Sequence, residues 1–279
     1  MTQIASRAIS LEHIQSFFKP RPIDAHKGMF GRILIVGGDI GMPGSVRLAG
    51  EGALRVGAGL VTVVTRKVHL SAVVSTRPEL LCYGIEHEFK RFKRLLQQAT
   101  IVVLGPGLGQ IFWSQRLFKT VLSANLPMVI DADGLNLLAR MSTLPKSKPW
   151  ILTPHPGEAA RLLGTSTDMI QNDRLAAVSM LQQRYGGVVV LKGAGTLISA
   201  ADTDPVHCQA GNPAMASAGM GDVLSGMMGG LLGQGLSPWE AAQAGVVLHA
   251  VAGDQVASKR GCRGIVASDI LGALATVVF

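Results

Sequence analysis

The segment Gly211-Asn212-Pro213-Ala214-Met215-Ala216-Ser217-Ala218-Gly219-Met220-Gly221-Asp222-Val223-Leu224-Ser225-Gly226 is a glycine-rich turn that runs directly into an apolar stretch. Apolar residues then recur with helical spacing at Val223, Leu224, Met227 and Leu231. This pattern predicts a helix whose N-terminus lies at Gly219 to Asp222. A helix N-terminus has unpaired N–H groups and a partial positive charge, so it favours a phosphate. The glycines would let a ligand approach the backbone, because they have no Cβ.

Asp222 is the unusual residue in this segment, because a carboxylate beside a phosphate site repels the ligand. One interpretation is that Asp222 takes a proton from a hydroxyl group that is about to be phosphorylated. The other interpretation is structural: Asp222 caps the helix, and the glycines serve only close packing. The segment taken alone leaves both interpretations open.

Glycine is abundant, with 34 residues in a chain of 279, and it often follows apolar runs such as 33–36 and 101–104. A strand, a glycine-rich turn and a helix in succession are typical of a parallel sheet. The chain can bury a large core, and no linker divides it. We therefore expect one α/β domain over residues 26–279, preceded by a lead-in segment over residues 1–25.

The expected strands end in loops that carry most of the polar and glycine-rich sequence. Strands are expected at 32–36, 60–65, 101–104, 128–130, 150–152 and 188–191, with a last one near 265–267. Helices are expected after 43, at 86–98, 168–185 and 237–257, and from a cap at Ser268. Five of the loops are rich in Gly, Pro, Asp and His. Because parallel strands bring such loops together, a single active-site edge is predicted.

Three of these loops carry candidate site residues. His155 lies between two prolines on a stiff extended loop, which favours a ligand contact over a purely structural histidine. The segment Lys192–Thr196 combines a lysine with a glycine turn, and it suits a nucleotide phosphate or a plain hairpin turn equally well. Asp133 can cap the helix after the strand at 128–130, which leaves Asp131 without a role.

Composition excludes several classes of protein. The net charge of +8 raises nucleic acid as a partner, but the densest basic run, 90–94, has no reading motif beside it. We interpret the run as a solvated helix face and the net charge as an attraction for small polyanions such as nucleotides. Three cysteines without a C-x-x-C indicate a reducing compartment without disulfides or a zinc site. No signal peptide or membrane span is apparent, so we expect a cytoplasmic protein without membrane contact.

Seven motifs extend the pattern along the chain. In order they are H-K-G-x-x-G from residue 26, G-G-x-x-x-M-P-G from 37, L-G-P-G-L-G from 104, D-A-D-x-L-N from 131, T-P-H-P-G-E from 153, K-G-A-G-T from 192 and G-M-G-D-V-L-S-G from 219. With these motifs in this order, the sequence resembles the ADP/ATP-dependent NAD(P)H-hydrate dehydratases of the ribokinase-like superfamily. The resemblance implies a single-domain three-layer sandwich, in which a mainly parallel sheet carries helices on both faces.

The resemblance also implies a repair reaction. Such enzymes remove water from (6S)-NADHX or NADPHX, the hydrated forms of NADH and NADPH, and couple this step to hydrolysis of ADP or ATP. Hydroxide is a poor leaving group at neutral pH, so the hydroxyl is phosphorylated first and phosphate is then expelled. The resemblance further implies Mg²⁺, ADP as the bacterial phosphate donor and a homotetramer. It also implies a separate NAD(P)HX epimerase, because we expect no room for an epimerase domain in this chain.

Residue roles follow from the same resemblance. Asp222 resembles the family's catalytic base, with Gly219 and Gly221 in the anion hole. The family's hydrated-nicotinamide contacts match Gly44, Ser45, Gly107, His155 and Asp222. Its adenine-nucleotide contacts match Lys192, Gly193, Ala194, Gly195, Thr196 and Gly221. Glu158 resembles the acidic residue that orders Mg²⁺ through water, while His155 replaces the Asn of more distant relatives and so argues against direct metal ligation.

Two other functions compete with this one. A kinase of the same superfamily, acting on a hydroxymethylpyrimidine or hydroxyethylthiazole, would use the same base and anion hole but release a stable phosphate ester. The T-P-H-P-G-E and H-K-G motifs favour the dehydratase over the kinase. A nucleotide sensor without catalysis would lack the acid at 222, so the presence of Asp222 argues against it.

The interpretation of the basic run leads to a test. Replacing Lys90, Arg91, Lys93 and Arg94 together by Gln should leave turnover nearly unchanged, because the run is expected to face solvent away from the site. Steady-state kinetics on a folded variant checks this, and a large loss of activity would show that the site is misplaced.

Overall fold

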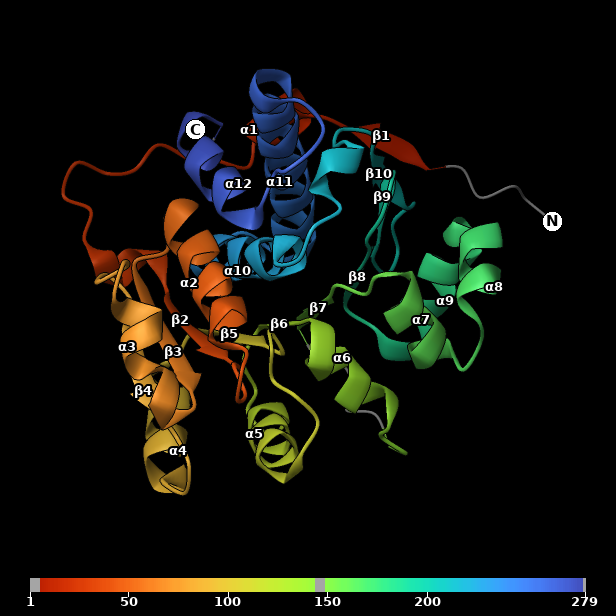
Figure 1. Cartoon of the computed structure of the whole chain (residues 1–279). Coiled ribbons are helices and arrows are strands. Elements are labelled where there is room, and N and C mark those ends of the chain that lie inside the picture. The colour runs from red at the N-terminus through yellow and green to blue at the C-terminus, as the bar shows by residue number, and fades with distance from the viewer. Residues whose placement is uncertain (1–5, 144–148, 278–279) are drawn as a thin grey trace.

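The computed structural model describes residues 6–143 and 149–277, in which ten strands form one sheet (Figure 1). The strands are β1 (Arg7–Ile9), β2 (Arg32–Val36), β3 (Leu60–Thr65), β4 (Leu81–Gly84), β5 (Ile101–Leu104), β6 (Met128–Ile130), β7 (Trp150–Leu152), β8 (Val188–Leu191), β9 (Thr196–Ser199) and β10 (Val206–Cys208). Their order across the sheet is β1-β10-β9-β8-β7-β6-β5-β2-β3-β4. Strand β9 runs antiparallel to its neighbours β8 and β10, and the other paired strands are parallel.

Helices cover both faces of this sheet, as expected from the sequence (Figure 1). They are α1 (Leu11–Gln15), α2 (Pro43–Arg55), α3 (Leu70–Val74), α4 (Phe89–Gln98), α5 (Phe112–Leu122), α6 (Ala132–Ala139), α7 (Pro156–Leu163), α8 (Thr167–Asn172), α9 (Arg174–Tyr185), α10 (Met220–Gly233), α11 (Pro238–Arg260) and α12 (Ala267–Ala273). Short 3₁₀ segments lie at Lys27–Phe30, Lys67–His69, Pro213–Met215 and Leu274–Thr276. Helices α2, α10, α11 and α12 pack on one face, and α4, α5, α6, α7 and α9 on the other.

The apolar run of β2 shows how the sequence produces these layers. Side chains alternate along a strand, so Ile33 and Ile35 join the core under α2 and α10, while Leu34 and Val36 join the opposite core. All four are at most 2% exposed. A strand buried on both faces is continuously apolar, and this explains why the pattern predicted a parallel sheet.

Three sequence expectations at the ends of elements are wrong. No strand forms near 265–267; α12 begins at Ala267, and the N–H of Val266 donates to the Asp269 carboxylate at 3.0 Å. Ser268 therefore lies inside this helix and does not cap it. The helix expected over 168–185 is two helices, because Asp173 leaves the helical region and its carboxylate accepts from Ala176 N at 2.9 Å.

The segment expected as a lead-in contributes to the same sheet. Of residues 1–25, residues 1–5 lie outside the part of the chain that the structure describes. Strand β1 pairs in parallel with β10 at one edge of the sheet, and α1 packs against the core under α11. Short strands at the edges, including β4 at the other end, were not anticipated because β1 and β4 each bury only one residue and lack the continuous apolar run of the central strands.

Helices α2 and α10 approach each other backbone to backbone through glycines. A Cβ at Gly226 would overlap the carbonyl oxygen of Ala49, and a Cβ at Gly230 would lie 2.7 Å from the carbonyl oxygen of Ala53. Ala49 lies opposite Gly226, and Ala53, four residues further along α2, lies opposite Gly230, four residues further along α10. The two helices therefore run in parallel, with their N-termini side by side. The packing therefore places the glycine-rich turn before α10 next to the first turn of α2.

This packing gives a stability test. The substitution Gly226→Ala should destabilise the fold by about 1–3 kcal/mol, or prevent folding, because backbone cannot move away as a side chain can. Gly272→Ala is the matched control: nothing lies within 4 Å of a Cβ there, so the helix should gain roughly 0.5–1 kcal/mol. Urea unfolding measures both, and equal stabilities of the two variants would contradict the tight contact.

Candidate active site

The N-terminus of α10 begins at Met220, where the sequence predicted a helix start. Gly219 precedes it with φ of 88°, a left-handed conformation, and a Cβ there would lie 2.5 Å from Leu48 Cδ1. A glycine is therefore required at 219. The first N–H groups of a helix have no partner within it, and Gly221 adds no Cβ to cover them. This end of α10 is built to present backbone donors to an anion.

The first turn of α2 lies against this end of α10. The Ser45 hydroxyl donates a hydrogen bond to the Asp222 carboxylate. Gly107, in the loop after β5, packs against Ser45 so closely that a Cβ would lie 3.0 Å from Ser45 Cβ. Gly44 has nothing within 4 Å of where its Cβ would be, so it faces open space. The structure thus brings together Gly44, Ser45, Gly107 and Asp222.

Lys192, directly after β8, carries a positive charge to the same edge of the sheet. Its Nζ lies 2.6 Å from Asp131 Oδ1 and 3.8 Å from Glu158 Oε2. Burial alone would lower the pKa of Lys192, but the adjacent Asp131 and Glu158 carboxylates raise it, so the side chain stays an ammonium. A Cβ on Gly221 would lie 3.4 Å from this Nζ, so the ammonium is also next to the N-terminus of α10.

Of the two aspartates after β6, Asp131 has a partner that the sequence did not reveal, and the expected role of Asp133 is wrong. Asp131, 1% exposed, is the partner of Lys192. Asp133 does not cap the helix, because α6 already begins at Ala132. The Asp133 carboxylate accepts from Gly109 N at 2.9 Å and so secures the loop after β5. The sequence positions of the two acids could not reveal these partners, because Lys192 and Gly109 lie in loops that follow other strands.

His155 and Glu158 fix each other at the start of α7. The N–H of His155 donates to Glu158 Oε2 at 2.8 Å, and His155 Nδ1 accepts from Gly157 N at 3.0 Å. Burial, together with the nearby Lys192, lowers the pKa of His155, so it is neutral at neutral pH. Burial raises the pKa of Glu158, and the Asp131 charge adds to this effect. His155 and Glu158 therefore lie on the Lys192 side of the site in one rigid loop.

Asp222 is the carboxylate with the most suitable pKa for proton transfer. Burial raises the pKa of Asp222 to about 6, and the Asp131 charge adds to the increase. The Ser45 hydrogen bond and the Lys192 charge oppose the shift without cancelling it. A base with a pKa just below neutrality is ionised at pH 7 and still accepts a proton readily.

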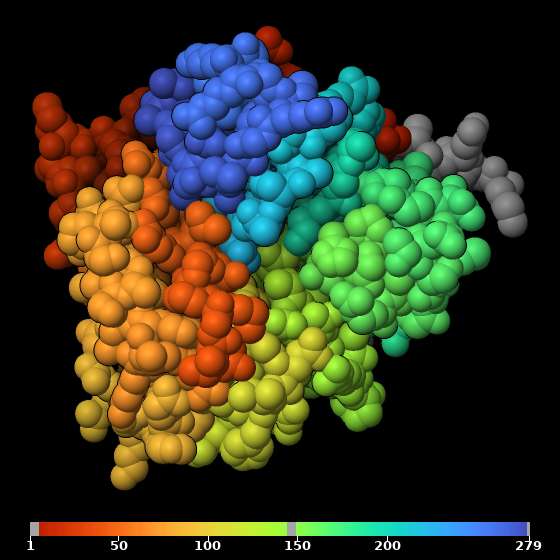
Figure 2. All heavy atoms as spheres, in the orientation of Figure 1, coloured from red at the N-terminus to blue at the C-terminus, as the bar shows by residue number. Residues whose placement is uncertain are grey.

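A cavity of about 540 Å³ opens beside Lys192 and Gly221. Its walls are residues 192–196, 209–213, Met215, Ala216, Met220, Gly221, Leu224, Val246, His249 and Ala250. Residues 192–195 form the turn of the β8–β9 hairpin, and the same residues line the cavity. Figure 2 shows this face of the molecule hollowed between the orange end of α2, the green helices and the blue C-terminal part.

One wall residue of this cavity was missed from the sequence. His249, in the middle of α11, is 7% exposed, and burial lowers its pKa to about 4, so it is neutral. A histidine within a long apolar helix gives no loop or motif signal, and only the packing of α11 against α10 brings it to the cavity.

The described residues contain neither a metal-binding group nor a membrane-spanning helix. Within residues 6–143 and 149–277, no three His, Cys, Asp or Glu side chains are grouped so that they could hold a metal ion. In the same residues, no helix combines the length and the apolar character needed to span a membrane.

The raised pKa of Asp222 predicts a pH-dependent stability. The folded value of about 6 is above the ordinary 3.8, so the folded state binds this proton more tightly and loses stability as pH rises from about 4 to 6. Asn at 222 cannot ionise. The variant Asp222→Asn should therefore be more stable than the wild type above pH 6, by on the order of 1–3 kcal/mol. Urea unfolding at several pH values checks this, and a difference that stays constant down to pH 4 would contradict it.

Comparisons with known proteins agree on one family. The family model described as NAD(P)H-hydrate dehydratase matches residues 33–275. The bifunctional NAD(P)H-hydrate repair enzyme Nnr of Coxiella burnetii is 49% identical over 98% of this chain and 55% of its own length, so the chain spans about half of that relative. The ADP-dependent (S)-NAD(P)H-hydrate dehydratase of Neisseria meningitidis is 39% identical over 96% of this chain and 90% of its own.

A solved structure gives the same result for the fold. The ADP/ATP-dependent NAD(P)H-hydrate dehydratase of Bacillus subtilis, co-crystallised with ATP and Mg²⁺, is 29% identical, with a TM-score of 0.89 over 99% of this chain and 98% of its own. The expected ribokinase-like fold is therefore confirmed. The motifs, the arrangement of the site and these comparisons together establish that the chain belongs to the NAD(P)H-hydrate dehydratase family.

Proposed function

We propose that this chain is an ADP- or ATP-dependent (S)-NAD(P)H-hydrate dehydratase, which returns NADHX and NADPHX to NADH and NADPH. The observation that carries the proposal is the Asp222 carboxylate, held by Ser45 at the anion-binding end of α10. Beside it lie the Lys192 ammonium and a cavity of about 540 Å³, a volume typical of small-molecule sites. The names of the relatives from Neisseria meningitidis and Bacillus subtilis support the same activity.

In the first step, Asp222 takes the proton of the substrate's 6-hydroxyl group as its oxygen attacks the terminal phosphorus of the nucleotide. A pKa of about 6 suits this transfer at neutral pH. The Ser45 hydroxyl orients the carboxylate. We propose Gly44, Ser45, Gly107 and the neutral His155 as contacts of the hydrated nicotinamide, since glycines let a ring approach closely and a neutral imidazole adds no charge.

The transferred phosphate develops its charge at the end of α10. The backbone N–H groups of Gly219 and Gly221 are proposed as its donors, and the Lys192 ammonium lies next to them. The adenine nucleotide would occupy the cavity, with contacts to Lys192, Gly193, Ala194, Gly195, Thr196 and Gly221. Phosphorus–oxygen bond formation to the 6-hydroxyl then releases AMP from ADP, or ADP from ATP.

The second step breaks the bond between C6 and oxygen. The lone pair of the ring nitrogen expels the phosphate, which keeps the former hydroxyl oxygen, and C5 then loses a proton to water, which restores the ring double bond. A phosphate dianion is a far better leaving group than hydroxide. This difference explains why nucleotide hydrolysis accompanies the loss of water.

The donor set fits a hydrated Mg²⁺ and not a metal enclosed by protein. Glu158 offers carboxylate oxygens, but the ammonium of Lys192 lies 3.8 Å away, and no three-residue metal group occurs within the described parts of the chain. Mg²⁺ commonly keeps several waters and binds through one carboxylate and the phosphates of a nucleotide. We propose that Glu158 would hold it through water, where the ion neutralises phosphate charge.

The oligomeric state, the cellular location and a partner enzyme are also proposed. We propose a homotetramer in the cytoplasm that works with an NAD(P)HX epimerase, since dehydration of one epimer leaves the other to be converted. The bifunctional names of relatives such as the Coxiella burnetii enzyme support an epimerase as the functional partner.

The activity is tested directly by incubating the protein with hydrated NADH, Mg²⁺ and either ADP or ATP. The expected result is return of the dihydronicotinamide absorbance, dependent on the nucleotide. Absence of that signal with a folded protein, or equal turnover without nucleotide, would reject the proposal.

The substitution Asp222→Asn tests the base. Asn keeps the size of Asp but cannot accept a proton, so kcat should fall on the order of 10²–10⁴-fold. Nucleotide affinity should persist or increase, because the amides of Gly219 and Gly221 are unchanged and a negative charge is gone. Turnover and nucleotide titration on one preparation check both effects. An active variant would show that Asp222 is not the base. The structure already argues against a capping role, because α10 begins at Met220 and Asp222 lies inside its first turn.

A further inference from the structure

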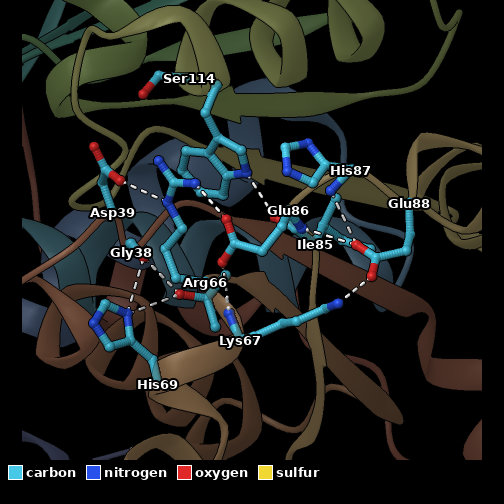
Figure 3. Close-up of polar contacts among 12 residues, drawn as sticks. Gly38, Asp39, Arg66, Lys67, His69, Ile85, Glu86, His87, Glu88 and Ser114 are labelled. Carbon is cyan, nitrogen blue, oxygen red and sulfur yellow. Dashed lines mark hydrogen bonds and ion pairs between the residues drawn. The ribbon is translucent and has the colours of Figure 1, made fainter.

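A second polar cluster, outside the residues assigned above, lies around Arg66 at the carboxyl end of β3 (Figure 3). Arg66 Nε donates to Asp39 Oδ1 at 2.8 Å, and Arg66 Nη1 donates to Glu86 Oε2 at 2.6 Å. The guanidinium also lies 4.1 Å from the ring centroid of Trp113. The Arg66 and Asp39 side chains are only 12% and 11% exposed. A guanidinium that is paired with two carboxylates and packed on an indole has little freedom to move.

The charges of this cluster argue against a site for a phosphate or another anion. Arg66 and Lys67 face three carboxylates, Asp39, Glu86 and Glu88, in a connected set of ion pairs. The acids outnumber the bases, so an anion would be repelled. The cluster therefore fits a structural role better than a role in binding an anion.

Asp39 connects two loops that follow neighbouring strands. Its N–H donates to the Gly107 carbonyl at 2.6 Å, and its own carbonyl accepts from Met42 N at 2.9 Å. One residue earlier, Gly38 N donates to the Pro106 carbonyl at 2.9 Å. These hydrogen bonds join the loop at 37–42 after β2 to the loop at 105–109 after β5. Arg66 binds the side chain of Asp39, which lies between the two loops.

These loops position the residues that are proposed to contact the hydrated nicotinamide. Gly44 and Ser45 begin α2 directly after the first loop, and Gly107 lies in the second. The fit between the loops allows little movement, since a Cβ on Gly107 would lie 2.9 Å from Met42 Cβ and 3.0 Å from Ser45 Cβ. A shift of Asp39 would therefore change the spacing of Gly107 and Ser45.

We propose that Arg66 is a positioning residue for the dehydration substrate, acting through Asp39 on the loops at 37–42 and 105–109. This inference rests on the proposed function. It concerns only the substrate side of the site, because the cavity proposed for the nucleotide is secured differently. There, the Asp254 carboxylate accepts from Gly211 N at 2.9 Å and from Asn212 Nδ2 at 2.7 Å, and so holds the wall at 209–213.

The substitution Arg66→Lys keeps the charge but cannot serve both acceptors with one compact ammonium. We expect kcat/KM for the hydrate to fall on the order of 10–100-fold, mainly through KM, as for a misplaced substrate. Nucleotide affinity should stay within about twofold, because the variant leaves that side of the site unchanged. Asp39→Asn should have the same effect, and the double variant should be no worse than either single one.

Asp254→Asn is the matched control on the other side of the site. It should weaken nucleotide binding and leave the KM for the hydrate near its wild-type value. Equal losses for hydrate and nucleotide in Arg66→Lys, or losses that add fully in the double variant, would overturn the positioning role. If Arg66→Lys does not fold, Asp39→Asn tests the same contact alone.

Hydrogen exchange of the free protein separates this inference from the proposed function. Amides at 37–42 and 105–109 should exchange faster in Arg66→Lys than in the wild type, and those at 209–213 should not. A wild type without hydrate turnover would reject the proposed function, whereas unchanged exchange in both loops would reject the role of Arg66.

Discussion

The contact between α2 and α10 determines how the site is assembled. Gly226 and Gly230 remove the side chains that would otherwise separate the helices, and the backbone of α10 lies directly on the carbonyl groups of α2. Because the two helices run in parallel, their N-termini meet, and Ser45 reaches Asp222. A wider spacing would separate the carboxylate from the hydroxyl that orients it. In the sequence, the small residues of both helices look like an ordinary packing pattern. In the structure, they determine the distance between the helix N-termini that carry Ser45 and Asp222.

The charges of the site divide three carboxylates into two kinds. Asp131 and Glu158 are buried and lie close to the Lys192 ammonium, at 2.6 Å and 3.8 Å. Asp222 is farther along the edge, where burial and the Asp131 charge raise its pKa to about 6. The Lys192 charge opposes the effect of burial at both Glu158 and Asp222, yet burial raises the pKa of each of these carboxyls. A carboxyl with a raised pKa at the edge of a cavity, and without a lysine paired to it, is a candidate for proton transfer.

Much of the fold could be predicted from sequence, because buried parallel strands are continuously apolar and their loops are rich in glycine and polar residues. Strand β2, the turn before α10 and the capped start of α11 at Ser237 were all expected correctly. The errors lie where a local pattern competes with a tertiary contact. Asp173 divides the expected helix over 168–185, and residues near 265 enter a helix cap and not the sheet.

The site was harder to predict than the fold. Motifs identified the loops, but they could not show that Asp131 pairs with Lys192, or that Asp133 supports the loop after β5. His249 and Arg66 carry no local signal, because their significance comes from the surfaces against which α11 and β3 pack. Partners that are distant in the chain can be identified only when the fold is known.

In the proposed reaction, Asp222 activates the 6-hydroxyl group for phosphorylation, so that this oxygen leaves with the phosphate. Hydrated NADH labelled with ¹⁸O at the 6-hydroxyl tests the claim most directly, with mass spectrometry of the inorganic phosphate formed in unlabelled water. Phosphorylation of the 6-hydroxyl group predicts one ¹⁸O atom in the phosphate for each NADH restored. Unlabelled phosphate, with the label released into water, would contradict it.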